Sequence, residues 1–254
     1  MFYLAVKPAI LHLMKRTIKY CLQKTLGMSN YLFLFSIYSI WRLKANRHER
    51  EFVCFLEKIP NEGVILDIGA NIGIMTISLA KKLDKAQIYA FEPIPDNLKA
   101  LKRILNHYKP GNVKVFETAL GEENGTIQMV LPVMDKMKMQ GLSHVVKEND
   151  NSEWNTGQVY SLPVKKLDDI QELKELPKIT AIKIDVENFE YYVFKGGREL
   201  LLKHKPLIYC ELWANEMRPV CLNYLKDLGY KVSIFDGEKL VPYTNQEETN
   251  FFLE

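Results

Sequence analysis

The chain has 254 residues, of which 47% are hydrophobic and 26% are charged, and this composition excludes a disordered or fibrous protein. The net charge of +3 is divided unevenly: residues 1–50 hold nine basic residues and one acid (+8), whereas residues 51–254 hold 25 basic and 30 acidic ones (−5). Four cysteines without a CxxC pair exclude a disulfide framework and predict reduced thiols in a cytoplasmic protein.

The basic N-terminal segment is also apolar. Its first part predicts a helix with one apolar stripe, made of Leu11, Met14, Ile18 and Leu22. Residues 31–41 form an apolar run of 11 residues, which is too short for a spanning helix of about 20. Pro8 directly after the first lysine, and the lack of a small-residue cleavage site after an apolar stretch, argue against a signal peptide.

Two interpretations of residues 1–45 stay open. They form a helical cap that packs on the rest of the chain, or they lie on an anionic membrane surface, where Trp41 and Arg42 suit the interface. The second would place a cytoplasmic protein at the inner face of the membrane. In either case we expect residues 1–47 to precede a domain at 48–254.

From residue 64 onwards, short apolar runs alternate with stretches of helical period. The runs predict strands at 64–68, 88–91 and 113–120, with helices at 73–83 and 95–108 between them. Further strands are predicted at 179–186, 207–213, 230–235 and 250–253, the last two as an antiparallel edge, with helices at 190–205 and 216–228. This alternation predicts an α/β fold with a mainly parallel sheet covered on both faces.

A glycine turn follows the first predicted strand. Gly69 allows the backbone to approach a ligand, and the helix after it offers free N–H groups. Asn71 stands where a dinucleotide-binding loop has its second glycine, which disfavours a pyrophosphate ligand. Asp67 before the turn suits a cationic ligand, and S-adenosylmethionine carries an ammonium and a sulfonium group.

Glu92 ends the next predicted strand, 25 residues after Asp67. A carboxylate in that place can accept hydrogen bonds from both hydroxyls of a ribose. Together with the glycine turn, it predicts a nucleoside site.

Residues 132–163 lack a clear period, although 126–131 is compatible with a strand. A loop of this length is commonly functional or mobile, so we expect it to fold over the site as a lid. It contains His144, which is a candidate proton acceptor because an imidazole titrates near neutral pH. No cluster of histidine and cysteine has metal-ligand spacing, so no metal is predicted.

Two acids follow the predicted strand at 179–186, at the sheet edge where α/β folds bind ligands. Asp185 is the first candidate for the base that takes a proton from an acceptor hydroxyl, or for the group that orients acceptor and cofactor, and Glu187 is the second. A simpler interpretation of Asp185 is a cap on the next helix.

Four motifs in this order resemble the FkbM-type family of S-adenosylmethionine-dependent methyltransferases: Asp67-Ile68-Gly69-Ala70-Asn71-Ile72-Gly73, Phe91-Glu92-Pro93-Ile94-Pro95-Asp96-Asn97-Leu98, Ala119-Leu120-Gly121 and Ile182-Lys183-Ile184-Asp185-Val186-Glu187-Asn188-Phe189-Glu190. The resemblance implies a class I methyltransferase (Rossmann-like) fold, with a seven-stranded, mostly parallel sheet whose last strand is antiparallel. One position departs from the family, which usually has glycine at Asn188. Asparagine tolerates a left-handed backbone better than most residues.

The resemblance also implies roles for individual residues. It places Gly69, Asn71 and Gly73 along the methionine part of S-adenosylmethionine, with Asp67 helping to hold it. Glu92 would bind the ribose. Thr118 and Ala119, at the end of the third predicted strand, would lie beside the adenine.

The family resemblance predicts methyl transfer to a hydroxyl of a sugar, glycan or related metabolite. One alternative is a nucleic-acid methyltransferase that grips phosphates with its basic N-terminus, although nucleic acid is disfavoured because long apolar runs interrupt the basic residues. Another is a non-catalytic, membrane-docked protein that keeps the nucleoside pocket.

Overall fold

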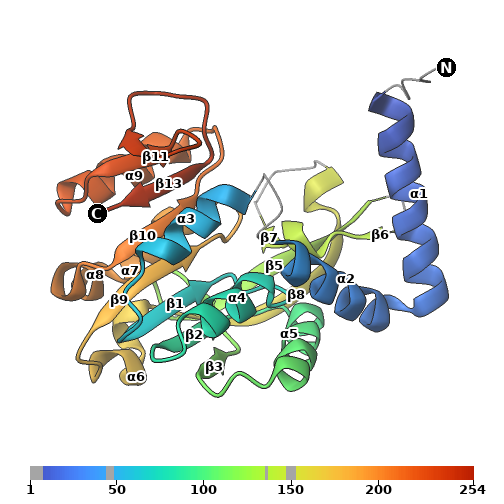
Figure 1. Ribbon diagram of the computed structural model, residues 1–254, viewed down its shortest axis with the longest axis horizontal. Coiled ribbons are helices and arrows are strands. Elements are labelled where there is room, and N and C mark those ends of the chain that lie inside the picture. The colour runs from blue at the N-terminus through green and yellow to red at the C-terminus, as the bar shows by residue number, and fades with distance from the viewer. Residues whose placement is uncertain (1–7, 44–48, 135–136, 147–152) are drawn as a thin grey trace.

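The computed structural model describes the backbone of residues 8–43, 49–134, 137–146 and 153–254 (Figure 1). It describes the side chains of these ranges except those of residues 8–16, 134, 137, 140 and 153.

The core of the protein is an eight-stranded sheet in the order β12-β11-β13-β10-β9-β1-β2-β3. Its parallel part is β3 (Val113–Phe116), β2 (Gln87–Phe91), β1 (Val64–Ile68), β9 (Ile179–Ile184) and β10 (Leu207–Glu211). β13 (Asn250–Leu253) runs antiparallel between β10 and β11 (Val232–Phe235). The predicted α/β fold is confirmed. The eighth strand is β12 (Leu240–Pro242), which pairs with β11 beyond the seven predicted strands.

Helices cover both faces of this sheet because its central strands are apolar on both sides. α6 (Gln171–Lys174), α7 (Glu190–Gly196), α8 (Arg198–His204) and α9 (Met217–Asp227) pack on one face. α3 (Arg50–Lys58), α4 (Ile74–Lys82) and α5 (Pro95–Tyr108) pack on the other. The sequence prediction missed α3, although Phe52, Phe55 and Leu56 have helical spacing and are buried, with the Phe55 ring stacked on Tyr209.

The predicted third strand at 113–120 is two strands in different sheets. After β3 the chain leaves the main sheet, and β4 (Ala119–Leu120) pairs with β8 (Gly157–Lys165). β8 also pairs with β5 (Gly125–Met134), and β6 (Met137–Lys138) and β7 (His144–Val145) complete a second, five-stranded sheet. The expectation of an irregular segment at 132–163 is therefore wrong in part. Cross-strand partners from distant parts of the chain stabilise these strands, and a local period does not reveal them.

The helix predicted at 190–205 is interrupted between α7 and α8. A Cβ atom on Gly196 would lie 1.9 Å from the backbone oxygen of Gly121, so the helix can pass this loop only with a glycine there.

The first two helices lie at the end of the molecule opposite α9 (Figure 1). α1 (Pro8–Leu26) leads into α2 (Met28–Arg42), and α2 packs against α4 and α5. Tyr31 and Leu32 are buried against Ile72 and Ala100, and the Arg103 guanidinium donates to the backbone oxygen of Ser29. None of the described helices is long and apolar enough to cross a membrane.

The apolar stripe predicted on α1 can be followed only in part. Ile18 and Leu22 are exposed, by 55% and 41%, whereas Leu11 and Met14 lie outside the residues whose side chains are described.

Candidate active site

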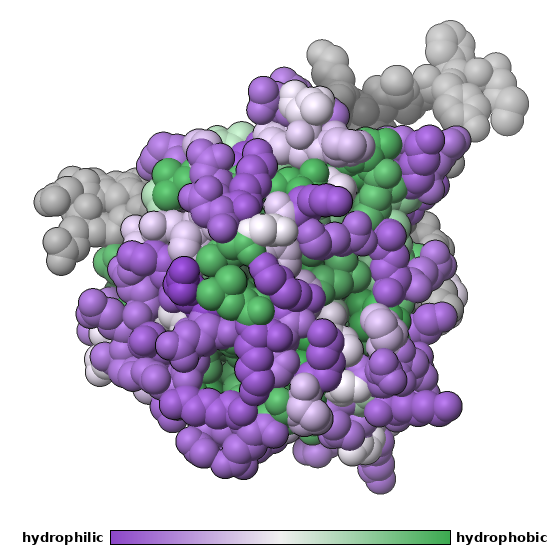
Figure 2. Space-filling view, turned by 90° about the vertical axis from the view of Figure 1, so that its left-hand side faces the viewer, coloured by the Kyte–Doolittle hydropathy of each residue, from purple (hydrophilic) through white to green (hydrophobic). Residues whose placement is uncertain are grey.

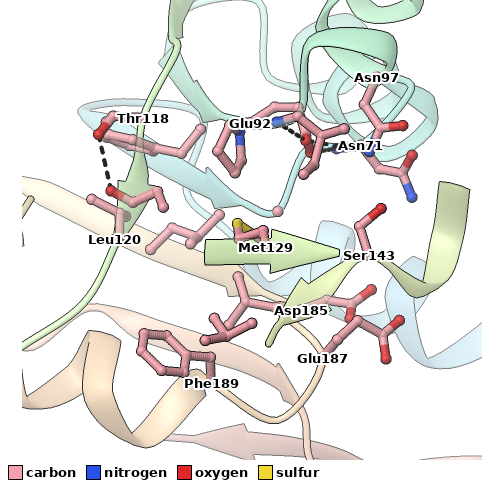
Figure 3. Close-up of a pocket in the computed structure, with 18 of the residues that line it drawn as sticks. Asn71, Glu92, Asn97, Thr118, Leu120, Met129, Ser143, Asp185, Glu187 and Phe189 are labelled. Atoms are coloured by element: carbon pink, nitrogen blue, oxygen red, sulfur yellow. Dashed lines mark hydrogen bonds between the residues drawn. The ribbon is translucent and has the colours of Figure 1, made fainter. Parts of the chain in front are cut away.

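A cavity lies where the carboxyl ends of β1, β2 and β9 face the second sheet. It has about 640 Å³ of empty space, solvent at its mouth included. In Figure 3, Asp185, Glu187 and Ser143 lie at one end of the cavity, away from Thr118 and Leu120 at the other. This is the sheet edge at which the sequence predicted a ligand site.

The glycine turn after β1 forms one wall. Gly69 has a φ of +76°, and a Cβ atom there would lie 1.9 Å from the backbone oxygen of Asp185, so no other residue fits. Asn71 is also left-handed, with a φ of +51°. Gly69 and Asn71 both line the cavity. Gly73, at the start of α4, does not line it and lies against Leu101 of α5 instead.

Glu92 follows β2 and lines the cavity beside the glycine turn. Its Oε2 accepts the backbone N–H of Asn71 at 2.8 Å. Its Oε1 accepts the backbone N–H of Ile94 at 2.9 Å and the side-chain amide of Asn97 at 3.2 Å. Burial raises the pKa of Glu92 to about 7, although these hydrogen bonds oppose the rise. Glu92 therefore shapes the turn and also offers its remaining lone pairs to a ligand.

Thr118 and Ala119 lie on the side of the cavity formed by the second sheet. Both line it and both are buried. The Thr118 hydroxyl makes hydrogen bonds to the backbone oxygens of Ala119 and Pro163, at 3.0 and 3.1 Å, so it ties β4 to β8.

The turn after β9 carries the two predicted acids. Asp185 and Glu187 both line the cavity. Glu187 and Asn188 are left-handed, with φ values of +53° and +73°, and Asn188 accepts a hydrogen bond from the Asn215 side chain. The turn thus forms with asparagine at the position where the family usually has glycine.

Burial raises the pKa values of three glutamates in and beside this turn. Burial, and then the charge of Asp185, raise the pKa of Glu187 to about 9. Burial likewise raises the pKa values of Glu190 and Glu211 to about 7. The Glu190 carboxylate accepts the backbone N–H of Val186 at 3.0 Å and so holds the turn in place. At neutral pH Glu187 keeps its proton, because its pKa lies well above 7.

Asp67 does not line the cavity. It is fully buried beneath it, where Oδ2 accepts the Thr76 hydroxyl at 2.6 Å and Oδ1 lies 3.6 Å from Lys183 Nζ. Lys183 also donates to the backbone oxygen of Gly69 at 3.0 Å and lies 4.0 Å from Asp185 Oδ2. Asp67 therefore acts on the site through the position of Lys183.

His144 is not brought to the cavity. The neighbours of His144, Ser143 and Val145, line the cavity. Because side chains alternate along a strand, the His144 side chain on β7 points away from the cavity. Its Nδ1 lies 2.8 Å from the backbone oxygen of Leu142.

Several residues in and beneath the cavity were not predicted from the sequence as site residues. Lys183 had a signal, because a lysine within a buried apolar strand needs anionic partners. Asn97, Met129 and Ser143 line the cavity, and only the packing of the second sheet brings the last two there. No group of three or more His, Cys, Asp or Glu side chains in the described part of the chain is placed to hold a metal ion.

The cavity has hydrogen-bond acceptors without partners, and these suit the predicted cofactor. Asn71 Oδ1 and Asn97 Oδ1 are buried without a hydrogen-bond partner among the described residues. Buried acceptors of this kind need donors, and the ammonium, hydroxyl and amino groups of S-adenosylmethionine are donors. Apolar side chains such as Ile127, Met129 and Phe189 form a surface suited to its adenine.

Comparison with known proteins places the chain among methyltransferases. The family model of the methyltransferase FkbM domain matches residues 67–232. The hexuronic acid methyltransferase AglP of Haloferax volcanii is 29% identical over 175 residues, which are 66% of this chain and 66% of that protein. The 2-O-methyltransferase NoeI of Sinorhizobium fredii is 32% identical over 176 residues, which are 66% of this chain and 70% of that protein.

A solved structure shares the fold. The crystal structure of a methyltransferase FkbM from Methylobacillus flagellatus aligns with a TM-score of 0.52 at 16% identity, over 93% of this chain and 60% of that one. The match of the family model runs from Asp67 near the end of β1 to Val232 at the start of β11, and it includes Glu92 and Asp185. The chain therefore belongs to the FkbM family of methyltransferases, and S-adenosylmethionine is its methyl donor.

Proposed function

We propose that the protein transfers a methyl group to a hydroxyl of a sugar, glycan or related metabolite. Residues 48–254 would form the catalytic domain, and residues 1–47 a segment added to it. One observation carries the proposal: Asp185 lines the cofactor cavity and also an adjoining second cavity, so its carboxylate can face a methyl donor on one side and an acceptor on the other. The names of AglP and NoeI support a saccharide acceptor.

Within this proposal, bound S-adenosylmethionine supplies an electrophilic methyl group. Asp185 would accept the proton that the acceptor hydroxyl loses, while the hydroxyl oxygen replaces the sulfonium sulfur on the methyl carbon and S-adenosylhomocysteine is released. Glu187 is unsuited to that role at neutral pH because it already carries a proton. Its protonated carboxyl can instead donate a hydrogen bond to the acceptor or to Asp185. Gly69 and Asn71 set the distance between the donor and Asp185.

A labelling experiment tests this function. The protein is incubated with S-adenosylmethionine labelled in its methyl group and with separate pools of glycans, lipids and RNA. We expect label in the glycan pool, in a form that is released as a methyl ether of a sugar. Label in RNA would favour the nucleic-acid alternative. Tight binding of S-adenosylmethionine without label in any pool would favour the alternative of a non-catalytic protein that keeps the nucleoside pocket.

Glu92 gives a test of ribose binding. We expect Glu92→Gln to weaken S-adenosylmethionine binding by about 1.5–3 kcal/mol at pH 8, the usual contribution of hydrogen bonds to a charged group. Because the pKa of Glu92 is about 7, the affinity of the wild type should fall more than that of the variant as the pH is lowered to 6. Calorimetry at both pH values measures this, and the difference between the two proteins cancels the titration of the cofactor.

The exposed Glu117 provides the control, since Glu117→Gln removes a carboxylate outside the cofactor cavity. Equal affinities of wild type and Glu92→Gln at pH 8 would contradict the ribose assignment.

The membrane contact of residues 1–45 stays a prediction. α2 packs on the body through Tyr31 and Leu32, as expected for a cap, whereas Trp41 on the same helix is 78% exposed. Sedimentation with anionic vesicles at low and high salt tests the contact. Binding that weakens with salt and with Trp41→Ser would support it.

A further inference from the structure

The second cavity lies between the N-terminal helices and the cofactor site. It has about 1000 Å³ of empty space, solvent at its mouth included. It shares Gly69, Asn71, Gly141 and Asp185 with the cofactor cavity, so the two meet at the carboxylate proposed as the base. A molecule in the second cavity would therefore be next to the methyl donor.

The walls of the second cavity are largely apolar. The side chains that form them come from α2, α4 and the segment before β7: Tyr31, Leu32, Phe35, Met75, Met139 and Leu142. The Tyr31 and Phe35 rings stack with centroids 5.9 Å apart and form one continuous surface. An unsubstituted sugar would leave most of its hydroxyls without partners here, whereas an apolar substituent would bury its surface.

One cation faces this apolar cavity from α1. Lys19 is half-buried, and its Nζ lies 3.7 Å from the Met139 sulfur. Glu49 and Asp185 line the same cavity, but no ion pair joins Lys19 to an acid among the described residues, and burial is the one cause that shifts its pKa. Burial lowers the pKa of Lys19, so its charged form lacks the stabilisation that an anionic partner would give. The other lysine of the cavity, Lys183, is already paired with Asp67 and lies 4.0 Å from Asp185.

The cavity opens towards an apolar surface. Phe35 lines it and is nevertheless 43% exposed. Of the 13 large exposed hydrophobic side chains among the described residues, seven are on α1 and α2: Ile18, Leu22, Leu26, Leu34, Phe35, Tyr38 and Trp41. By contrast, the face on the side of α8 and α9 is mostly hydrophilic and has only small, separate hydrophobic areas (Figure 2). An apolar group that leaves the cavity at Phe35 would thus continue along apolar side chains.

We propose that the second cavity is the acceptor site, and that its acceptor is a sugar with an anionic group and an apolar substituent. The reacting hydroxyl lies at Asp185, the anionic group pairs with Lys19, and the apolar substituent runs along Tyr31 and Phe35. This inference rests on the proposed function and adds the class of acceptor to it.

Three probes separate these features in a binding experiment. Octyl β-D-glucuronide has both the anion and the apolar chain, octyl β-D-glucoside has only the chain, and glucuronic acid has only the anion. Each is titrated below its micelle-forming concentration into the full chain saturated with S-adenosylhomocysteine. We expect octyl glucuronide to bind at least about tenfold more tightly than either of the other two probes, because only octyl glucuronide can make both the charge pair and the apolar contact.

Matched variants locate the contacts. Lys19→Met should weaken the binding of octyl glucuronide by about tenfold and leave the binding of octyl glucoside unchanged. Lys24→Met, on the same helix but outside the cavity, should change the binding of neither compound. Phe35→Ser should weaken binding of both octyl compounds. Leu202→Ser on α8, which is similarly exposed (40% against 43%) and lies outside both cavities, should not. S-adenosylhomocysteine affinity should stay the same in all four variants, which shows that they are folded.

The outcomes distinguish this inference from the proposed function. If saccharides are methylated but the Lys19 and Phe35 variants behave like the wild type, or like their controls, the acceptor site lies elsewhere and only this inference is overturned. If octyl glucuronide binds with the expected dependence on Lys19 and Phe35 but no saccharide is ever methylated, the site assignment holds and the proposed methyl transfer is overturned.

Discussion

Asp185→Asn is expected to reduce turnover by about 10²–10⁴-fold, while affinity for S-adenosylmethionine stays within about threefold. Asparagine keeps the shape of the side chain but cannot accept the proton of the acceptor hydroxyl. Asp185 makes none of the hydrogen bonds that hold Glu92 and Asn71 in the cofactor cavity, so binding should survive. Single-turnover methyl transfer and calorimetry on the same preparation measure the two effects.

Glu187→Gln is the matched control, because a glutamine resembles the protonated carboxyl that a pKa of about 9 gives Glu187 at neutral pH. Its turnover at pH 7 should change by less than about tenfold. Wild-type turnover in Asp185→Asn, together with a large loss in Glu187→Gln, would transfer the role of base to Glu187. Unchanged turnover in both variants would contradict the assignment of Asp185 as the base.

Lys183→Met is expected to lower the free energy of unfolding by about 3–5 kcal/mol, the usual effect of removing one member of a buried ion pair. Burial by itself lowers the pKa of Lys183, but the surrounding carboxylates, Asp67 first and then Asp185 and Glu211, together raise it, so the side chain is charged at neutral pH. The change would leave Asp67 Oδ1 buried without either a cation or a hydrogen bond. Urea unfolding of the variant and the wild type measures the loss.

A second substitution separates this electrostatic effect from poor packing. Asp67→Asn added to Lys183→Met removes the unpaired charge but keeps the side chain that accepts the Thr76 hydroxyl, so it should restore much of the lost stability. Lys102→Met, which breaks an exposed pair with Glu117, should have little effect. Equal stability of the single and the double variant would contradict the ion pair as the cause.

The parts of the fold that the sequence predicted are those that neighbouring residues determine. β1, β9 and α5 are close to their predicted ranges because uninterrupted apolar runs and a regular helical stripe need no distant partner to be recognised. The segment 132–163 was misjudged for the opposite reason. β5 and β8 are held by each other across more than twenty residues of chain, and their polar and proline-containing sequences have no strong preference of their own.

The candidate site divides in the same way. The sequence by itself determined the glycine turn at Gly69, the acid after β2 and the acids after β9, because a left-handed turn and the carboxyl end of a strand impose residue types locally. Only the tertiary structure decided what these residues do. It buries Asp67 beneath the cavity opposite Lys183 on the neighbouring strand, raises the pKa of Glu187 by burial beside Asp185, and turns His144 away. It also brings α1 and α2 against the second cavity, because burial, strand register and the pairing of charges depend on residues that are close in space and far apart in the chain.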